Sequence, residues 1–75
     1  MKSSVFIIKD LPVAAYLAYK RIKMVAPWDS LTRSWAFDDT DLICQRLELE
    51  VRNGEALVSV LDYESARKNI LSMVR

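Results

Sequence analysis

The chain has 75 residues with a formal net charge of +1, and 52% of them are hydrophobic while 28% are charged. This composition excludes a disordered chain, and the length corresponds to one small domain over residues 1–75, whose high ratio of surface to volume favours self-association in so apolar a chain. With no histidine, one cysteine and one glycine, the chain lacks the residues of Ser-His triads, histidine metal sites, internal disulfides and glycine-rich phosphate loops.

The first predicted element is a strand over residues 4–9. Residues 5–8 are all apolar and either β-branched or aromatic, and the run is too short for a helix. Because apolar side chains would point to both faces, we expect both faces to be covered. The strand would then lie at the centre of the sheet, or it would have helices on one face and a partner on the other. The same run is too short for a membrane span or a signal sequence, so we expect a cytoplasmic protein.

A helix is predicted over residues 11–21. Asp10 is a capping residue, and Pro12 falls in the first turn, where its missing N–H costs nothing. Tyr16 and Tyr19 are expected at the edges of an apolar stripe whose small side chains permit close approach to the sheet. The stripe consists of Leu11, Ala14, Ala15, Ala18 and Ile22, with Leu17 beside it.

Two strands over residues 23–28 and 33–38 are predicted to form a β-hairpin. Pro27 and the turn-forming Asp29 and Ser30 end the first strand, and a four-residue connection over residues 29–32 leads into the second. Trp28 and Trp35 are expected to lie near each other. The period-2 pattern of the second strand predicts one face with Arg33, Trp35 and Phe37 and another with Ser34, Ala36 and Asp38.

The run Asp38, Asp39, Thr40 and Asp41, of which any of the first three can cap, predicts the start of a second helix that extends to about residue 52. Carboxylates are also the ligands that divalent cations prefer, but an EF-hand would need a glycine and a glutamate that are missing, so we expect capping and no metal site. Asn53 and Gly54 end the helix, and Gly54 is expected to take positive φ. The buried row is expected to be Ile43, Leu47 and Val51, widened by Leu42 and Leu49.

The last helix is predicted from Val60 to nearly the end of the chain. Ser59 and Asp62 approximate a capping box at its start. The order β-α-β-β-α-α predicts an α+β fold, with a three-stranded sheet and helices packed on one face. The buried stripe of this helix is expected to be Tyr63, Ala66, Ile70 and Met73 or Val74.

Three landmarks support a family resemblance. They are D-L-x-x-A-A-Y-L from Asp10 to Leu17, F-x-D at the end of the hairpin around Phe37, and N-G-x-A-x-V from Asn53 to Val58. Over residues 5–71 this pattern resembles a family of short uncharacterised bacterial and phage proteins, catalogued as a domain of unknown function. The resemblance implies a fold and a bacterial or phage context, and it implies no activity. The chain departs from the family in lacking the usual glycine in the connection after Ala18.

A basic and aromatic constellation is the one candidate binding site in the sequence. Cations can contact phosphates and aromatic rings can stack on bases, which favours single-stranded or structured nucleic acid. A solvated helix end and aromatic core residues would explain the same side chains, and the net charge is near zero. The candidate residues are Lys20, Arg21, Lys23, Arg33, Trp28 and Trp35.

The absent residue types argue against an enzyme, and the sequence indicates no cofactor, metal or small-molecule substrate. We expect Cys44 to be a buried, unreactive thiol rather than a reactive one, because no basic neighbour would lower its pKa. The expected function is therefore that of a non-catalytic binding module without membrane attachment, which self-associates or binds a protein partner. The alternative is a small nucleic-acid-binding protein that uses the basic residues.

Overall fold

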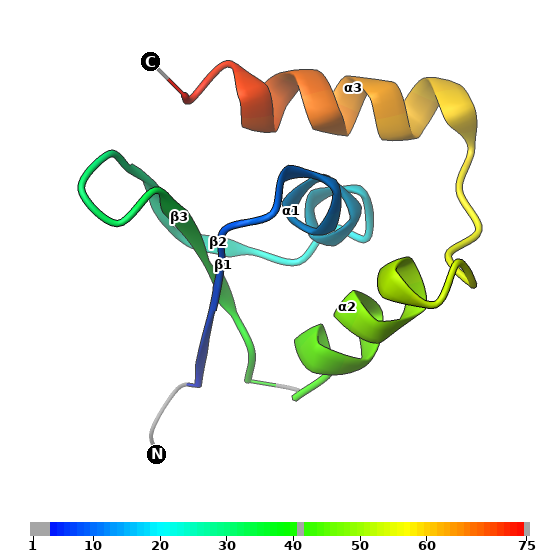
Figure 1. The fold of residues 1–75 in the computed structure, drawn as a ribbon, viewed down its shortest axis with the longest axis horizontal. Coiled ribbons are helices and arrows are strands. Elements are labelled where there is room, and N and C mark those ends of the chain that lie inside the picture. The colour runs from blue at the N-terminus through cyan, green and yellow to red at the C-terminus, as the bar shows by residue number, and fades with distance from the viewer. Residues whose placement is uncertain (1–3, 41, 75) are drawn as a thin grey trace.

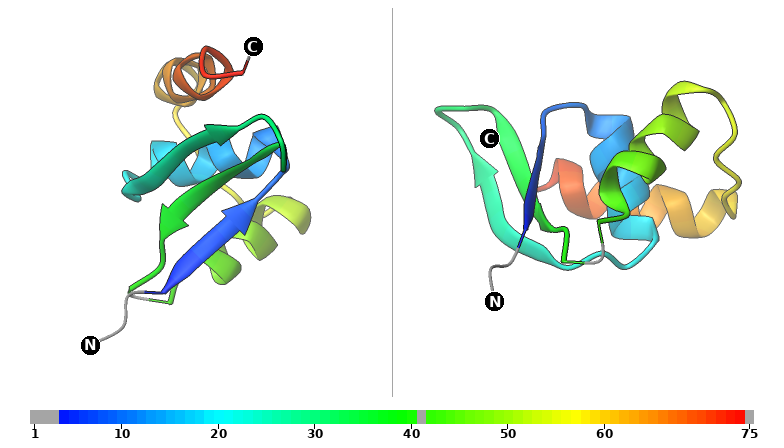
Figure 2. Two further views of the ribbon diagram at one scale, coloured as in Figure 1. Left: turned by 90° about the vertical axis from the view of Figure 1, so that its left-hand side faces the viewer. Right: turned by 90° about the horizontal axis from the view of Figure 1, so that it is seen from below.

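The computed structural model describes residues 4–40 and 42–74, and it confirms a small α+β domain. An antiparallel sheet forms one side of the molecule, and the helices of the described residues all lie on the same side of that sheet (Figures 1 and 2). The elements are β1 (Val5–Ile8), α1 (Leu11–Tyr19), β2 (Met24–Asp29), β3 (Ser34–Asp38), α2 (Cys44–Arg52) and α3 (Val60–Leu71).

The sheet has the strand order β1-β3-β2, with both pairs antiparallel. The predicted central position of the first strand is therefore wrong, because β3 lies at the centre and β1 at an edge. β3 carries Trp35 and Phe37, which are 3% and 0% exposed and face the helices. Two bulky core side chains need strands on both sides to enclose them. The outward side chains Val5 and Ile7 of β1 are 52% and 56% exposed instead.

The strand predicted over residues 23–28 is β2, which begins and ends one residue later, at Met24 and Asp29, and Pro27 does not interrupt it. β2 is an edge strand, where a residue without an N–H leaves no central ladder bond unmade. The register against β3 shifts between Met24 and Ala26 and again between Ala26 and Asp29.

α1 is the central element of the fold. It lies between α2 and α3 (Figure 1), and it is behind the sheet when the sheet is viewed from its outer face (Figure 2, left). Its residues 13–17 are buried without interruption, so the helix is enclosed on several sides rather than along one stripe. Tyr16, which the sequence placed at the edge of a stripe, is only 2% exposed, because its hydroxyl reaches α2 and donates a hydrogen bond to Glu50 Oε1 at 2.7 Å.

α2 packs a narrower face than predicted. Cys44 and Leu47 are buried, and Ile43 and Val51 are half-buried against the core. The predicted widening of this row is wrong, since Leu42 is 71% exposed and Leu49 is 49% exposed. Leu42 lies before the first residue of α2, and Leu49 lies on the part of this nine-residue helix that faces away from the core.

The start of α2 is capped from a distance. Asp39 Oδ1 accepts a hydrogen bond from the backbone N–H of Cys44 at 3.0 Å, which satisfies one of the free donors of the first turn. Asp38 instead accepts the backbone N–H of Thr40. The predicted capping role of the aspartates is thus confirmed for Asp39, while Asp41 lies outside the described residues.

The helix ends at Arg21 and Gly54 share one geometry. Arg21 has φ +63°, and the N–H groups of Arg21 and Ile22 donate to the carbonyls of Ala18 and Leu17. Gly54 has φ +71°, as predicted, and the N–H groups of Gly54 and Glu55 donate to Val51 and Glu50. Both are Schellman motifs, which require a left-handed residue just after the helix. Glycine meets this requirement without strain after α2, and an arginine meets it after α1.

α3 begins at Ser59 without the predicted capping box, because the Ser59 side chain makes no capping hydrogen bond. The backbone N–H of Ser59 donates to the Tyr19 hydroxyl at 3.0 Å instead. Tyr63 and Ala66 are half-buried and Ile70 is buried, as predicted, while Met73 and Val74 lie more than a third exposed past the helix end. Within residues 4–40 and 42–74, no helix is both long and apolar enough to cross a membrane.

Candidate functional site

The basic residues Lys20, Arg21 and Lys23 lie together on the turn between α1 and β2. The Schellman motif folds the chain back at this point, so the three exposed side chains leave the backbone within four residues of one another. None of them forms a salt bridge with another described residue. Lys20 Nζ lies 5.5 Å from the centroid of the Tyr16 ring, so this cation turns back over α1.

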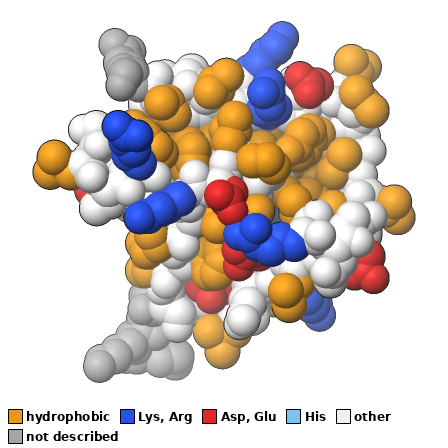
Figure 3. All heavy atoms as spheres, viewed as in Figure 1, with side chains coloured by type: hydrophobic (Ala, Val, Ile, Leu, Met, Phe, Trp, Pro, Cys, Tyr) orange, Lys and Arg blue, Asp and Glu red, His pale blue; other side chains and the backbone are white. Residues whose placement is uncertain are grey.

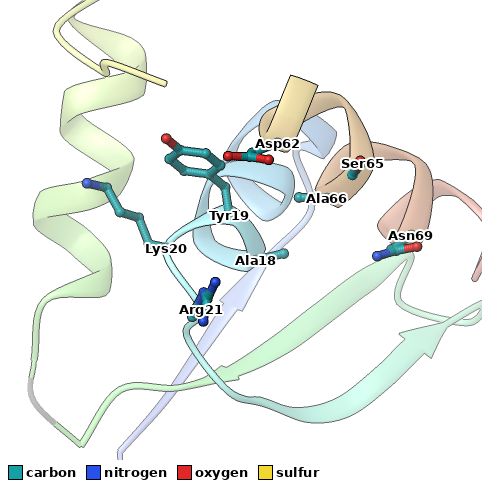
Figure 4. Close-up of a pocket in the computed structure, with 8 residues that line it drawn as sticks. All are labelled: Ala18, Tyr19, Lys20, Arg21, Asp62, Ser65, Ala66 and Asn69. Carbon is teal, nitrogen blue, oxygen red and sulfur yellow. The ribbon is translucent and has the colours of Figure 1, made fainter. Parts of the chain in front are cut away.

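A groove of about 610 Å³ runs between this turn and α3 (Figure 4). Arg21 and Tyr19 line it from α1 and the turn, and Asp62, Ser65 and Asn69 line it from α3. Figure 4 shows the Asp62 carboxylate beside the Tyr19 ring, while Lys20 extends away from α3. The residues that line the groove include the cations Lys20 and Arg21, the carboxylate of Asp62 and neutral polar groups, so it is not a uniformly basic surface.

A second hollow, of about 240 Å³, lies on the other side of Arg21 and is also lined by Lys23, Ile43 and Asp38. Hydrogen bonds from Thr40, and more weakly the charge of Lys23, hold the pKa of the Asp38 carboxyl below its ordinary value. Asp38 therefore keeps its negative charge near neutral pH. Each hollow beside Arg21 thus contains one carboxylate, which would repel a phosphate chain laid across both.

The other predicted nucleic-acid-binding residues do not join the basic turn. Arg33 belongs to the hairpin turn at the far end of β3, while the Lys23 carbonyl is bonded to the N–H of Asp38 at the near end. Five residues of extended strand separate the two cations by about 16 Å. The structure thus brings together only three of the four cations predicted from the sequence.

The tryptophans lie on the inner face of the sheet. Their ring centroids are 4.5 Å apart, which confirms the predicted proximity of Trp28 and Trp35. Trp35 is 3% exposed, and Trp28 is half-buried against the same core. The Trp35 indole Nε1 has no hydrogen-bond partner among the described residues. A base could stack on Trp35 only if the helices moved away.

The outer face of the sheet, which points away from the helices, is an uncovered surface with apolar side chains. The left panel of Figure 2 looks onto this face, and no other element lies in front of it. Val5, Ile7 and Val25 are between 47% and 56% exposed there. The backbone groups on the free edge of β1 also make no hydrogen bond to another described residue.

The outer face has a regular layout in rows across the strands. Ile7 pairs with Ala36, which pairs with Ala26, so one row has a large side chain on β1 and small side chains on β3 and β2. In the next row Ser34 pairs with Asp29, and continuing the register of β1 brings Lys9 beside Ser34. These two rows, together with Thr32, line a shallow hollow of about 440 Å³. The hollow has a lysine at one side and an aspartate at the other.

Exposed apolar side chains occur elsewhere as well. Leu57, Val60 and Leu61, at the start of α3, are 86%, 71% and 81% exposed. Hydrophobic side chains also cover much of the face drawn in Figure 3, with charged side chains between them and at its rim. The whole chain exposes 5468 Å², against about 4700 Å² expected for a compact monomer of its mass of 8.7 kDa.

Cys44 and the described aspartates were the remaining candidates for chemistry in the sequence. Cys44 is fully buried, which confirms its predicted burial, and burial together with the nearby Asp39 raises the pKa of its thiol to about 12. In the described part of the chain, no group of three or more cysteine, aspartate or glutamate side chains could hold a metal ion.

Neither a family model, a curated protein nor a solved structure matches this chain. The family resemblance based on the three landmarks therefore remains a prediction. The landmarks themselves have structural explanations, since the first forms α1, the second ends β3 and the third contains the Schellman glycine Gly54.

The sequence alone indicated only part of these two surfaces. The apolar run of residues 5–8 raised, as one alternative, helices on one face of the sheet and a partner on the other, and the structure places helices on one face (Figure 2). The pairing of Lys9 and Asp29 across one row was not predicted, because it depends on the register of three strands. The contribution of Asp62, Ser65 and Asn69 to the groove was also missed, and no spacing in the sequence marks these residues.

Proposed function

We propose that this protein is a non-catalytic interaction module whose binding surface is the outer face of the sheet. The observation that carries the proposal is the set of half-exposed apolar side chains Val5, Ile7 and Val25 on a face without a covering element. Side chains of this size transfer out of water with a gain of about 1.5–3 kcal/mol each when fully buried. A face of this kind is typical of a surface that another macromolecule covers.

Two measurements on the isolated protein test this proposal. Sedimentation velocity reports whether the face is covered by association, and the fluorescence of the apolar dye ANS reports whether it is free. We expect either a species larger than 8.7 kDa or a monomer that binds the dye. Ile7→Lys should remove whichever behaviour is found, because it places a charge in the middle of the face.

The matched control is Leu61→Lys, which makes the same change at a residue that is 81% exposed on α3. This variant should behave as the wild type. Circular dichroism and thermal melts should show both variants folded, because both positions face solvent. A wild type that is monomeric and binds no dye would contradict the proposal, and so would loss of association in Leu61→Lys alone.

Nucleic-acid binding at the basic turn is the second candidate function. It is supported by Lys20, Arg21 and Lys23, whose exposed side chains leave a single turn and form no salt bridge with another described residue. Against this stand the carboxylates Asp38 and Asp62 in the hollows on either side.

Labelled single-stranded and duplex oligonucleotides test this second candidate at two salt concentrations. Binding that uses Lys20, Arg21 and Lys23 should weaken steeply as salt rises, because phosphate contacts release counterions. Lys23→Glu should abolish it, while Arg33→Glu, at the far end of the hairpin, should leave it unchanged. No salt-sensitive binding at about 10 µM protein, a concentration in the middle of the usual range of non-specific dissociation constants, would contradict this function.

A further inference from the structure

We infer that the partner of the outer face is a second copy of this chain, packed sheet against sheet around a two-fold axis parallel to β3. The inference rests on the proposed function, since it names the partner of the same surface. The evidence for it is that, after this rotation, the two rows of residues on one copy match the same two rows on the other copy in size and in charge.

The first complementarity is one of size. A two-fold axis parallel to β3 places β1 of one copy over β2 of the other. Positions along the strands do not change, so each row of one sheet faces the same row of the other. Ile7 of one copy then lies over Ala26 of the other, and Ala36 lies over its own counterpart. The hollow above Ala26 and Ala36 receives a side chain that is 56% exposed in the single chain. Large side chains over small ones are what face-to-face sheets need in order to interdigitate at a separation of about 10 Å.

The second complementarity is one of charge. The same rotation places Lys9 of each copy over Asp29 of the other, so the dimer gains two identical ion pairs. Both residues are exposed, and neither forms a salt bridge within the described chain. Within one chain they stand on either side of β3, about 10 Å apart, which is too far for direct contact. The contact centres on these two rows. The adjoining row contains Val5 and Asp38, and the rotation brings the two Asp38 carboxylates over each other, so this row has to stay open to solvent.

A charge-swap cycle tests this arrangement. Equilibrium sedimentation should give the dimer dissociation constant of the wild type, of Lys9→Asp, of Asp29→Lys and of the double variant. Each single reversal replaces two attractive pairs by two repulsive ones, so each should weaken the dimer about tenfold at low salt. The double variant restores both pairs with opposite polarity and should return to within about threefold of the wild type.

The double variant also controls for folding. Asp29 Oδ1 accepts the backbone N–H of Leu31 at 2.9 Å, so Asp29→Lys alone could disturb the hairpin turn. Lys9→Asp cannot repair that turn, and rescue would therefore report the contact between copies. Thermal melts of all four proteins show whether each is folded.

The outcomes separate the inference from the proposed function. A dimer that Ile7→Lys dissociates but that shows no rescue in the double variant overturns the two-fold arrangement and keeps the outer face as the binding surface. A monomer that binds ANS in an Ile7-dependent way also overturns the inference, since the face would then await a different protein. A dimer that neither Ile7→Lys nor the reversals affect overturns both.

Discussion

Arg21 and Gly54 occupy the same position in two Schellman motifs, and they form a natural pair for measuring backbone strain. A Cβ atom at Gly54 would meet nothing within 4 Å, so Gly54→Ala changes only the cost of positive φ. We expect it to lower the free energy of unfolding by about 1 kcal/mol. Arg21→Gly should raise it by up to about 1 kcal/mol, because the strain is relieved while unfolded-state entropy offsets part of the gain.

Urea denaturation of the two variants measures both effects. Arg21→Ala is the control, since it removes the charge and keeps the strained backbone, and it should lie close to the wild type. A stabilised Arg21→Ala would show that the charge, rather than the left-handed φ, is what costs stability at this turn. If Arg21→Gly also abolished binding of a ligand, the arginine would be retained for that contact.

Cys44 permits a prediction about reactivity at the residue scale. Its side chain is fully buried, and burial raises the pKa of the thiol to about 12, so almost no thiolate is present at pH 8. The disulfide reagent DTNB should therefore label the protein only as fast as the chain unfolds. Labelling should become rapid in denaturing urea. Prompt labelling of the folded protein would mean that α2 opens locally.

At the scale of elements, one hydrogen bond joins α1 to α2. Tyr16 donates to Glu50, and burial followed by this bond raises the pKa of the phenol from 10.0 to about 12. The folded protein thus holds the phenol proton more tightly than the unfolded chain. The resulting stability is complete below pH 10 and is lost as the pH rises from 10 to 12, on the order of 2 kcal/mol.

Tyr16→Phe tests this linkage. At neutral pH the variant should be about 1–2 kcal/mol less stable, because Glu50 loses a donor. Between pH 10 and 12 its stability should fall less steeply than that of the wild type. The measurement is the free energy of unfolding in urea at several pH values. Equal slopes for the two proteins would contradict the raised pKa of Tyr16. Cys44→Ala serves as a comparison, because the thiol contributes its own loss from pH 9 upward.

The elements could be predicted from the sequence where local chemistry decides them. Gly54 ends α2 and Pro12 lies in the first turn of α1, as their backbone preferences require. The errors arise where a distant neighbour decides. Trp35 and Phe37 make β3 the central strand, which the apolar run of residues 5–8 obscured. Ser59 gives its N–H to Tyr19, forty residues earlier, and the expected capping box is not made.

The candidate site shows the same division. The sequence correctly grouped Lys20, Arg21 and Lys23, because they are neighbours along the chain. It could not show that Arg33 lies at the other end of the hairpin or that Trp35 is enclosed, since both facts depend on the tertiary fold. The rows that join Lys9 to Asp29 likewise appear only when three strands are aligned.

At the scale of the whole molecule, folding and association should be coupled. A chain of 75 residues has a small core, and covering the outer face of the sheet adds stability by mass action. We therefore expect the melting temperature of the wild type to rise by about 4 °C for each tenfold increase in protein concentration, from the unfolding entropy of two chains of this length. Ile7→Lys should melt at a temperature that does not depend on concentration. Calorimetry from 5 to 500 µM measures both slopes, and a wild type with no slope would show that the folded chain stands alone.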